Sequence, residues 1–237
     1  MTKELLKFSK WDTEILGIDY HILNSYDKRL NLAKILSNVT NNSLIFTRVD
    51  FNNLSLINKL LSKGFYIADI LLEFKYTVKK SKTENKINSN NISILDSKSK
   101  YKKDCINIIK NEFQIGRIHE DKHLGIKKGK KLYKEWCKNN FININTIAYI
   151  EDDIVKGFIQ FSLDKHTIRI IFIVINSKYQ NQGIGSKLIK YIKEYAFDNK
   201  CNEIIVGTQL NNINAINFYT KNDFIQKKSF VGLHYVK

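Results

Sequence analysis

Hydrophobic residues recur along the chain with periods that predict an alternation of strands and helices. Near the start, LIFTRV (residues 44–49) predicts a buried strand, because it is almost entirely apolar. Residues 53–65 predict a capped amphipathic helix, since their apolar positions recur at helical spacing and Gly64 provides a stop. Residues 66–78 predict a second strand. The first third of the chain is therefore expected to form a small α/β unit.

The remainder of the chain continues the same alternation and predicts a mixed sheet with helices packed on it. The expected elements are a strand over 92–95, helices over 97–113 and 127–139, a hairpin over 146–163 turned at 151–153, a strand over 167–175, a helix over 183–196, a strand over 203–208, a helix over 212–222 and a strand pair over 224–236. Tyr133 and Trp136, one turn apart on the second of these helices, are expected to lie in the core.

One polar stretch, KKSKTENKINSNN (residues 79–91), predicts a linker, because it holds a single large apolar residue. It divides the chain into a small N-terminal α/β domain (1–78) and a larger C-terminal domain (92–237). No internal repeat is evident in the sequence, although both parts have the α/β pattern.

Composition narrows the class of protein. The chain has 237 residues, 43% of them hydrophobic, with no apolar run long enough to span a membrane and no apolar signal-peptide core at the start. The three cysteines have no metal-ligand spacing, so free thiols in the cytoplasm are expected. The net charge of +16 could reflect an anionic partner, but the lysines are spread along a chain that is also rich in Asn and Ile. Nucleic-acid binding is therefore not expected from the charge.

A glycine pair, Gly183 and Gly185, stands between an apolar strand and a helical pattern. A strand that runs into Gly-x-Gly and then a helix leaves backbone N–H groups free to bind an anion. The pattern lacks the third glycine of a dinucleotide fingerprint and the Gly-Lys-Ser order of a P-loop. The residues alone therefore predict either a phosphate site or a close-packed turn.

Two motifs resemble a known enzyme family. Gln180–Gly185, QNQGIG, resembles the Gln/Arg-x-x-Gly-x-Gly/Ala signature of the GCN5-related N-acetyltransferases (GNAT). Further along, NNINAINFYTKNDF is similar to the family's Asn-x-x-Ala-x-x-x-Tyr segment through Asn212, Ala215 and Tyr219, although Asn222-Asp223 replaces its glycine-containing turn. The resemblance implies an α/β (α+β) GNAT acyl-CoA N-acyltransferase fold, with a mixed central sheet flanked by helices and a smaller N-terminal α/β domain.

The same resemblance implies that acetyl-CoA is the co-substrate and that no metal takes part. Loop amides would bind its pyrophosphate at the helix N-terminus, the preceding strand would pair with its pantetheine arm, and Tyr219 would protonate the departing thiolate as general acid. The alternatives are a half-buried aromatic for Tyr219 and a helix N-cap for Asn212. The implied cofactor-binding residues are Phe172, Ile173, Val174, Ile175, Gln180, Gln182, Gly183, Ile184, Gly185, Ser186, Lys187, Asn212 and Tyr219.

Three further segments resemble the dTDP-fucosamine acetyltransferase family, which acetylates the 4-amino group of a nucleotide-linked amino sugar. They are KWDTEILGIDYHIL (10–23), LSKGFYIADILLEF (61–74) and GRIHEDKHLGIKKGKKLYKEW (116–136). The departures are that no proline follows Asp121 and that Ile15-Leu16 replace two phenylalanines. Trp11, in the first segment, is expected to close the core of the small domain.

The acceptor side is predicted from the charged residues before the second long helix. The strand over 169–175 offers no carboxylate to act as a base. His119 and Asp121 are predicted to line the acceptor pocket and to act as catalytic residues that relay a proton through water. Arg117 is predicted to bind a diphosphate oxygen of the acceptor. The alternatives are a solvated loop and a surface arginine.

The function predicted from all of these features is N-acetyl transfer from acetyl-CoA to a nucleotide amino sugar, in a ternary complex and in the cytoplasm. Such a reaction would serve cell-surface polysaccharide biosynthesis. A peptide N-terminus or a polyamine as acceptor, and a non-catalytic acetyl-CoA-binding module, remain alternatives. The sequence leaves open whether the chain forms a homodimer.

Overall fold

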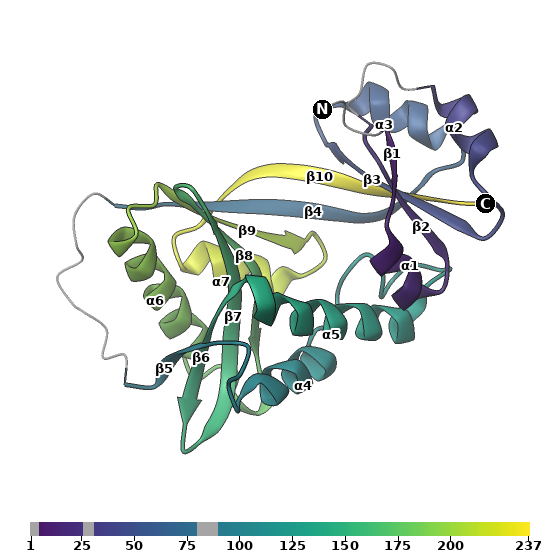
Figure 1. Cartoon of the computed structure of the whole chain (residues 1–237). Helices are drawn as coiled ribbons and strands as arrows, with labels where there is room; N and C mark the ends of the chain where they lie inside the picture. Colours follow the sequence, from purple (N-terminus) through teal and green to yellow (C-terminus); the bar gives the residue numbers. More distant parts are fainter. Residues whose placement is uncertain (1–4, 26–30, 80–89) are drawn as a thin grey trace.

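A single mixed sheet connects the two halves of the chain (Figure 1). The structure is a computed structural model and describes residues 5–25, 31–79 and 90–237. Within these residues the sheet has ten strands in the order β1-β2-β3-β10-β4-β9-β8-β7-β6-β5. The strands are β1 (Leu6–Phe8), β2 (Asp19–Leu23), β3 (Ser43–Asp50), β4 (Tyr66–Thr77), β5 (Ile92–Leu95), β6 (Asn145–Glu151), β7 (Ile154–Asp164), β8 (Thr167–Ile175), β9 (Glu203–Gln209) and β10 (Ile225–Val236). The helices are α1 (Lys10–Leu16), α2 (Leu32–Asn38), α3 (Leu54–Leu61), α4 (Lys102–Glu112), α5 (Gly125–Asn143), α6 (Ile184–Asp198) and α7 (Ile213–Lys221), with a short 3₁₀ helix, η1 (Ser177–Tyr179).

The hydrophobic patterns located most of these elements. The strand expected over 44–49 is β3, and the helix expected within 53–65 is α3. The expected hairpin is β6–β7, and Asp152 and Asp153 turn it with φ angles of 53° and 61°. The mixed sheet flanked by helices is therefore confirmed. Most of the expected linker, residues 80–89, lies outside the described residues.

The end of the chain differs from the prediction. The sequence pattern predicts a strand pair over 224–236, but the structure has one long strand, β10. β10 pairs antiparallel with β3 on one side and with β4 on the other. Because strands from the first third of the chain occupy both of its edges, β10 needs no hairpin partner of its own.

The two halves of the chain repeat one arrangement of strands and helices. The first run is β2-α2-β3-α3-β4, and the second is β8-α6-β9-α7-β10. The first two strands of each run are parallel: β2 pairs with β3, and β8 pairs with β9. The third strand of each run pairs with the second strand of the other run, so β4 lies beside β9 and β10 lies beside β3. The resulting order, β2-β3-β10-β4-β9-β8, is symmetric about the β10–β4 pair. The structure thus shows a repeat that is not evident in the sequence.

Helices α3 and α7 show the repeat at the level of single residues. Asn53 and Asn212 precede the two helices, and each side-chain oxygen accepts a hydrogen bond from the backbone N–H three residues later, at 3.1 and 3.2 Å. Gly64 and Asp223 follow the helices with left-handed φ angles of 88° and 62°, and each directly precedes a buried phenylalanine. The repeat is not evident in the sequence because the two runs share these capping positions, whereas most of their other residues differ from each other.

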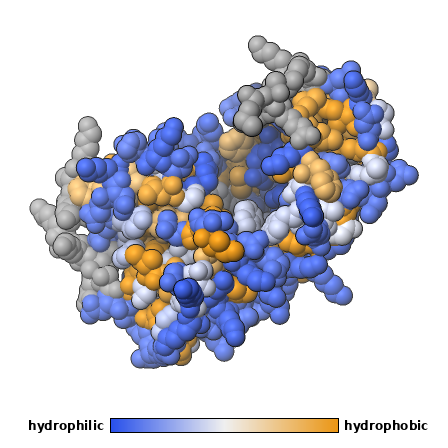
Figure 2. All heavy atoms as spheres, in the orientation of Figure 1, coloured by the Kyte–Doolittle hydropathy of each residue, from blue (hydrophilic) through white to orange (hydrophobic). Residues whose placement is uncertain are grey.

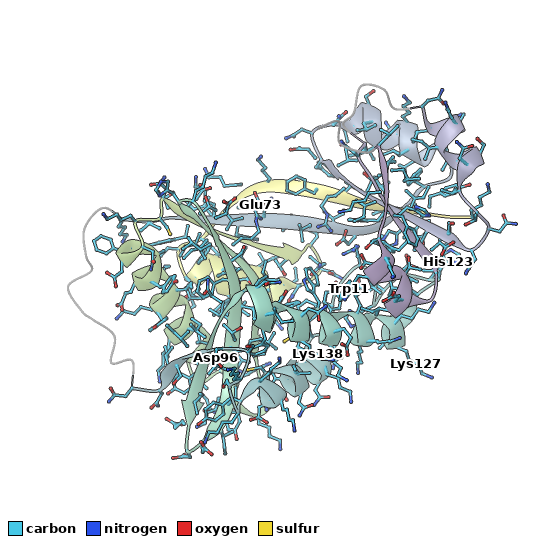
Figure 3. All side chains as sticks on the ribbon, in the orientation of Figure 1. Trp11, Glu73, Asp96, His123, Lys127 and Lys138 are labelled. Carbon is cyan, nitrogen blue, oxygen red and sulfur yellow. The ribbon has the colours of Figure 1, made fainter. Side chains whose placement is uncertain are left out.

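Four hydrophobic clusters fix the helices on the sheet. Helices α6 and α7 cover one face of the C-terminal half, and α4 and α5 cover the other. Helices α2 and α3 cover one face of the N-terminal half, while α1 and the first part of α5 cover the opposite face. Helix α5 therefore spans both halves, and Trp11 of α1 packs at its N-terminal part (Figures 1 and 3). Each fully buried large side chain contributes roughly 1.5–3 kcal/mol to the free energy of unfolding.

The surface is mainly hydrophilic. Figure 2 shows hydrophilic residues over most of the visible face, with hydrophobic residues exposed in separate groups. Among the helices that the structure describes, none combines the length and the apolar character that a membrane span requires. The three cysteines are buried and free.

Candidate active site

A cleft of about 1090 Å³ opens where β8 and β9 separate. The two strands pair in parallel from Thr167↔Glu203 to Ile170↔Val206, and the pairing ends there. Beyond this point residues 171–175 and 207–209 line the cleft from its two sides. Backbone groups on these facing edges are free to hydrogen-bond an extended ligand, as an added strand would.

The segment between β8 and α6 forms the glycine end of the cleft, which we define as residues 180–186. Gly183 precedes α6 with φ 76° and ψ 1°, a left-handed conformation that favours glycine. The first α-helical hydrogen bond runs from the N–H of Lys187 to the C=O of Gly183, at 3.0 Å. No side chain in the described residues caps this helix. The N–H groups of Ile184, Gly185 and Ser186 can therefore bind an anion at the positive end of the helix dipole.

Gly185 brings α7 close to α6. A methyl group on Gly185 would lie 3.0 and 3.1 Å from two ring carbons of Phe218, closer than side chains normally pack. The glycine therefore favours close packing against Phe218 as well as access to the backbone. This close approach places α7 along the same cleft.

Helix α7 contributes Asn212 and Tyr219 to the cleft lining. The Asn212 oxygen caps α7 by accepting the N–H of Ala215, which leaves the side-chain NH₂ group available as a donor. Tyr219 is 4% exposed, and its ring packs against Phe74 at a centroid distance of 5.7 Å. Burial raises the pKa of the Tyr219 phenol, so the hydroxyl stays protonated at neutral pH.

Away from the glycine loop the cleft is lined by side chains from both halves of the chain. We call this part the arginine end and define it as Arg48 of β3, Leu71 of β4, Arg117 from the segment between α4 and α5, and Tyr133 and Trp136 of α5. The Arg48 guanidinium donates to both carboxylate oxygens of Asp69, at 3.0 and 3.2 Å. The Arg117 guanidinium donates to the hydroxyl of Tyr20 at 2.8 Å.

Asp121 lies in a buried hydrogen-bond network behind the arginine end. Its carboxylate accepts from the ring of His234 at 2.7 Å, from the hydroxyl of Tyr66 at 2.8 Å and from the N–H of His123 at 2.8 Å. Burial alone would raise the pKa of Asp121, but these hydrogen bonds lower it to about 2. The network ties the segment before α5 to β4 and β10.

His119 is also buried behind the arginine end. Its ring stacks on Tyr133 with a centroid distance of 5.0 Å and an interplanar angle of 3°. Neither ring nitrogen has a hydrogen-bond partner among the described residues. Burial and the nearby charge of Lys130 lower the pKa of His119 to about 4, so the ring is neutral at physiological pH.

Comparison with known proteins decides the family. Residues 105–224, which are 120 of the 237 residues, match the model of the acetyltransferase (GNAT) family. The chain belongs to the GNAT acetyltransferase family. The matched range includes most of α4 and all of α5, the glycine end and α7. The predicted fold class and the predicted enzyme class, an acetyl-CoA-dependent N-acetyltransferase, are therefore confirmed at the level of the family.

A second family model matches the N-terminal region of this GNAT protein. Residues 13–74 match the MerR HTH family of regulatory proteins. A helix-turn-helix joins two helices by a turn of a few residues. In the described part of this range the helices α2 and α3 are instead separated by β3, which lies inside the sheet. The structure of this region is thus that of an α/β unit.

The individual relatives are distant. The spore coat polysaccharide biosynthesis protein SpsD of Bacillus subtilis (strain 168) is 24% identical over 131 residues, which cover 54% of this chain but only 45% of SpsD. A conserved protein of unknown function from Staphylococcus epidermidis ATCC 12228 has a TM-score of 0.66 at 14% identity, with coverage of 99% and 92%. A GCN5-related N-acetyltransferase from Sphaerobacter thermophilus has a TM-score of 0.56 at 8% identity, covering 81% of this chain and 59% of that one. These structural likenesses support the GNAT fold alone.

Most of the residues predicted for the cofactor line the cleft. Those that line the cleft are Phe172, Ile173, Val174, Ile175, Gln180, Gly183, Ile184, Gly185, Ser186, Asn212 and Tyr219, and Arg117 joins them at the arginine end. Gln182 and Lys187 are not part of the lining. Gln182 instead contacts the C=O of Lys178 at 3.5 Å, and Lys187 contacts the hydroxyl of Tyr149 at 3.3 Å.

The prediction that His119 and Asp121 line the acceptor pocket differs from the structure. Their side chains are 3% and 4% exposed, and neither belongs to the cleft lining. Tyr133 covers the His119 ring, and Asp121 is engaged with His234 and Tyr66. The charged pattern of this segment was interpreted as the lining of the acceptor pocket, whereas the His119 ring is stacked and the Asp121 carboxylate is hydrogen-bonded inside the fold.

Sequence reasoning missed several residues of the cleft. Arg48 comes from a strand in the first third of the chain, and no motif marks it. Tyr133 lies in the core as expected and also lines the cleft, whereas Trp136, expected in the core as well, lines the cleft and is 36% exposed. Glu112 is the one carboxylate in the lining within the described residues, and it accepts a hydrogen bond from Ser177 at 3.0 Å.

Proposed function

We propose that this GNAT-family protein transfers the acetyl group of acetyl-CoA to a primary amine, the 4-amino group of a nucleotide-linked amino sugar. The observation that carries the proposal is a single cleft that joins an uncapped helix N-terminus, two separated strand edges and the Tyr219 phenol. The pyrophosphate of acetyl-CoA would bind the N–H groups of Ile184–Ser186. The pantetheine arm would lie along Phe172–Ile175 and accept a hydrogen bond from Asn212, with the amine entering from the arginine end.

The transfer would be direct. The amine nitrogen attacks the thioester carbonyl carbon, and the C–S bond breaks when the tetrahedral intermediate collapses. Tyr219 gives its proton to the leaving sulfur, and the proton lost by the nitrogen returns to the phenolate through solvent. An acyl-enzyme route has little support, since the three cysteines are buried and burial raises the pKa of Cys105 and Cys137, which keeps both thiols protonated.

The proposed reaction needs a neutral amine. An amine on a sugar ring, next to electron-withdrawing oxygens, is a weaker base than lysine, so a larger fraction is neutral at pH 7. The relay role predicted for His119 and Asp121 stays a prediction. Because neither side chain lines the cleft, we favour an amine that arrives neutral and loses its second proton to water.

Two observations favour a nucleotide amino sugar as acceptor. The first is the relationship to SpsD, whose name places it in spore coat polysaccharide biosynthesis. The second is Arg117, which lines the cleft and offers a guanidinium to a diphosphate oxygen. A polyamine is disfavoured because two arginines line the end of the cleft where it would bind. We place the reaction in the cytoplasm, in line with three free cysteines, and in the biosynthesis of a cell-surface polysaccharide.

The first experiment is calorimetric titration of the protein with acetyl-CoA. We expect one site in the wild type and at least tenfold weaker binding in Gly185→Ala, because the methyl group pushes against Phe218. The double variant Gly185→Ala with Phe218→Leu should recover part of the affinity. If the folded wild type does not bind acetyl-CoA, the proposal is wrong.

A further inference from the structure

The arginine end is built on a row of residues that crosses three strands. Gly232 of β10 pairs with Arg48 of β3 on one side and with Asp69 of β4 on the other, so the three lie side by side on one face of the sheet. A methyl group on Gly232 would overlap with a carboxylate oxygen of Asp69. The glycine therefore leaves the space through which the Arg48 guanidinium reaches the Asp69 carboxylate.

Arg117 approaches the same place from the segment between α4 and α5. Its guanidinium carbon lies 4.2 Å from the centre of the Phe46 ring, and that of Arg48 lies 5.4 Å from the same ring. Phe46 precedes Arg48 by two residues on β3, so its ring lies on the same face of the sheet. One aromatic ring thus holds two guanidinium groups near each other.

The charges of this cluster do not balance. The Asp69 side chain, 2% exposed, pairs with Arg48. Arg117 forms no ion pair with any carboxylate in the part of the chain that the structure describes, and its guanidinium donates to the neutral hydroxyl of Tyr20. The Nε atoms of both arginines are buried without a hydrogen-bond partner among the described residues. A buried, uncompensated guanidinium is costly unless a ligand supplies the opposite charge.

We propose that Arg48 and Arg117 together form a clamp for phosphate oxygens of the acceptor, at the end of the cleft away from the CoA pyrophosphate. This inference rests on the proposed function and adds a binding residue, Arg48, from the N-terminal half. Two guanidinium groups fit a diphosphate, because each presents several N–H donors in a planar fork. Asp69 and Gly232 act as positioning residues that hold Arg48 in reach of the acceptor.

The clamp also explains why the N-terminal half belongs to the active site. The third strand of the second repeat, β10, lies between β3 and β4 of the first repeat. This exchange brings β3 next to the second repeat, and only for this reason does Arg48 of β3 enter the cleft. The acceptor is thereby defined as an amine that also carries phosphate. Polyamines and peptide N-termini without phosphate lack the group that the clamp binds.

The test is calorimetric titration of the protein, already saturated with CoA, with inorganic pyrophosphate and with dTDP. Because CoA fills the glycine end, anions added afterwards report on the arginine end. We expect both probes to bind, and Arg48→Gln to weaken them about 10- to 100-fold, the range expected for a charge-assisted hydrogen bond. Arg48→Lys should show a smaller loss, since the charge remains and the fork is lost.

The matched control is Arg169→Gln. Arg169 pairs with Glu73 at 3.2 Å on the same sheet, but neither residue lines the cleft, and Glu73 lies on β4 (Figure 3). The control should leave anion binding unchanged. If Arg48→Gln impairs folding by leaving Asp69 unpaired, the double variant Arg48→Gln with Asp69→Asn removes both charges and should show the same loss of binding.

The outcomes separate this inference from the proposed function. If the wild type binds CoA but the complex binds neither pyrophosphate nor dTDP, the clamp is wrong while the CoA site stands. Equal losses in Arg48→Gln and Arg169→Gln would also overturn it, because binding would then follow net charge alone. If CoA itself does not bind, the proposed function is the claim that fails.

Discussion

At the scale of single residues, the cleft combines buried groups whose protonation is controlled by their surroundings. Tyr219 is buried among aromatic rings yet lines the cleft, and burial raises its pKa. The phenol is therefore held in the protonated form, which can donate to a leaving thiolate. Asp121, in contrast, is held as a carboxylate by hydrogen bonds from His234, Tyr66 and backbone N–H groups, and serves the fold.

Replacing Tyr219 by phenylalanine tests its catalytic role. The variant keeps the aromatic packing and loses only the donor, so kcat should fall about 100-fold or more, the usual contribution of a general acid. Affinity for acetyl-CoA should stay within twofold of the wild type in calorimetry. Tyr195→Phe is the matched control, because Tyr195 lies on α6 outside the cleft lining. Unchanged turnover in Tyr219→Phe would remove the acid role.

Asp121 predicts a stability effect that depends on pH. Its folded pKa of about 2 is lower than the ordinary value of 3.8, so the carboxylate stabilises the fold above pH 4 and loses that contribution as the pH falls toward 2. Asp121→Asn should lower the free energy of unfolding by about 2 kcal/mol at pH 7 and by much less near pH 2. Urea unfolding at several pH values measures this.

The control for Asp121 is the exposed Asp164. Asp164→Asn should change the free energy of unfolding little at any pH, because surface substitutions rarely matter. A stability difference between wild type and Asp121→Asn that does not shrink toward low pH would contradict the network described here.

At the scale of elements, the repeated helices α3 and α7 offer a matched pair. Each begins with an asparagine cap, Asn53 or Asn212, but only Asn212 lines the cleft. Asn53→Ala and Asn212→Ala should both lower the free energy of unfolding by about 1 kcal/mol, the value of a lost N-cap. Only Asn212→Ala should weaken acetyl-CoA binding, as measured by calorimetry. Equal effects on binding would show that Asn212 acts through the helix alone.

The sequence predicted the glycine end and α7 because both depend on local rules. A left-handed cap favours glycine at Gly183, a helix start favours Asn212, and a family motif covers both. The arginine end follows no local rule. Arg48, Gly232 and Asp69 are far apart in the chain and meet only through strand pairing, so no spacing in the sequence marks them.

At the scale of the whole molecule, strand exchange makes the two halves depend on each other. β4 of the N-terminal half lies between β9 and β10, and β10 lies between β3 and β4 (Figure 1). Hydrophobic periodicity identifies most of the strands but carries no information on their neighbours in the sheet. The division into domains 1–78 and 92–237 therefore stays a prediction about chain segments, and the sheet runs continuously across it.

This arrangement predicts how fragments behave. Residues 90–237 alone should be insoluble or unfolded, because removal of β4 leaves β9 and β10 with unpaired edges. Co-expression of fragments 1–79 and 90–237 should yield a complex that purifies together and binds acetyl-CoA. Gel filtration and calorimetry provide the readout. A stable, acetyl-CoA-binding fragment 90–237 would contradict the interdependence.

The measurement that tests the central claim most directly is release of the CoA thiol from acetyl-CoA by the purified protein. The assay compares no acceptor, a dTDP-linked 4-amino sugar, a peptide with a free N-terminus and spermidine. We expect rapid thiol release with the nucleotide amino sugar and little with the other two amines. No release above the acceptor-free rate with any of these amines would contradict it.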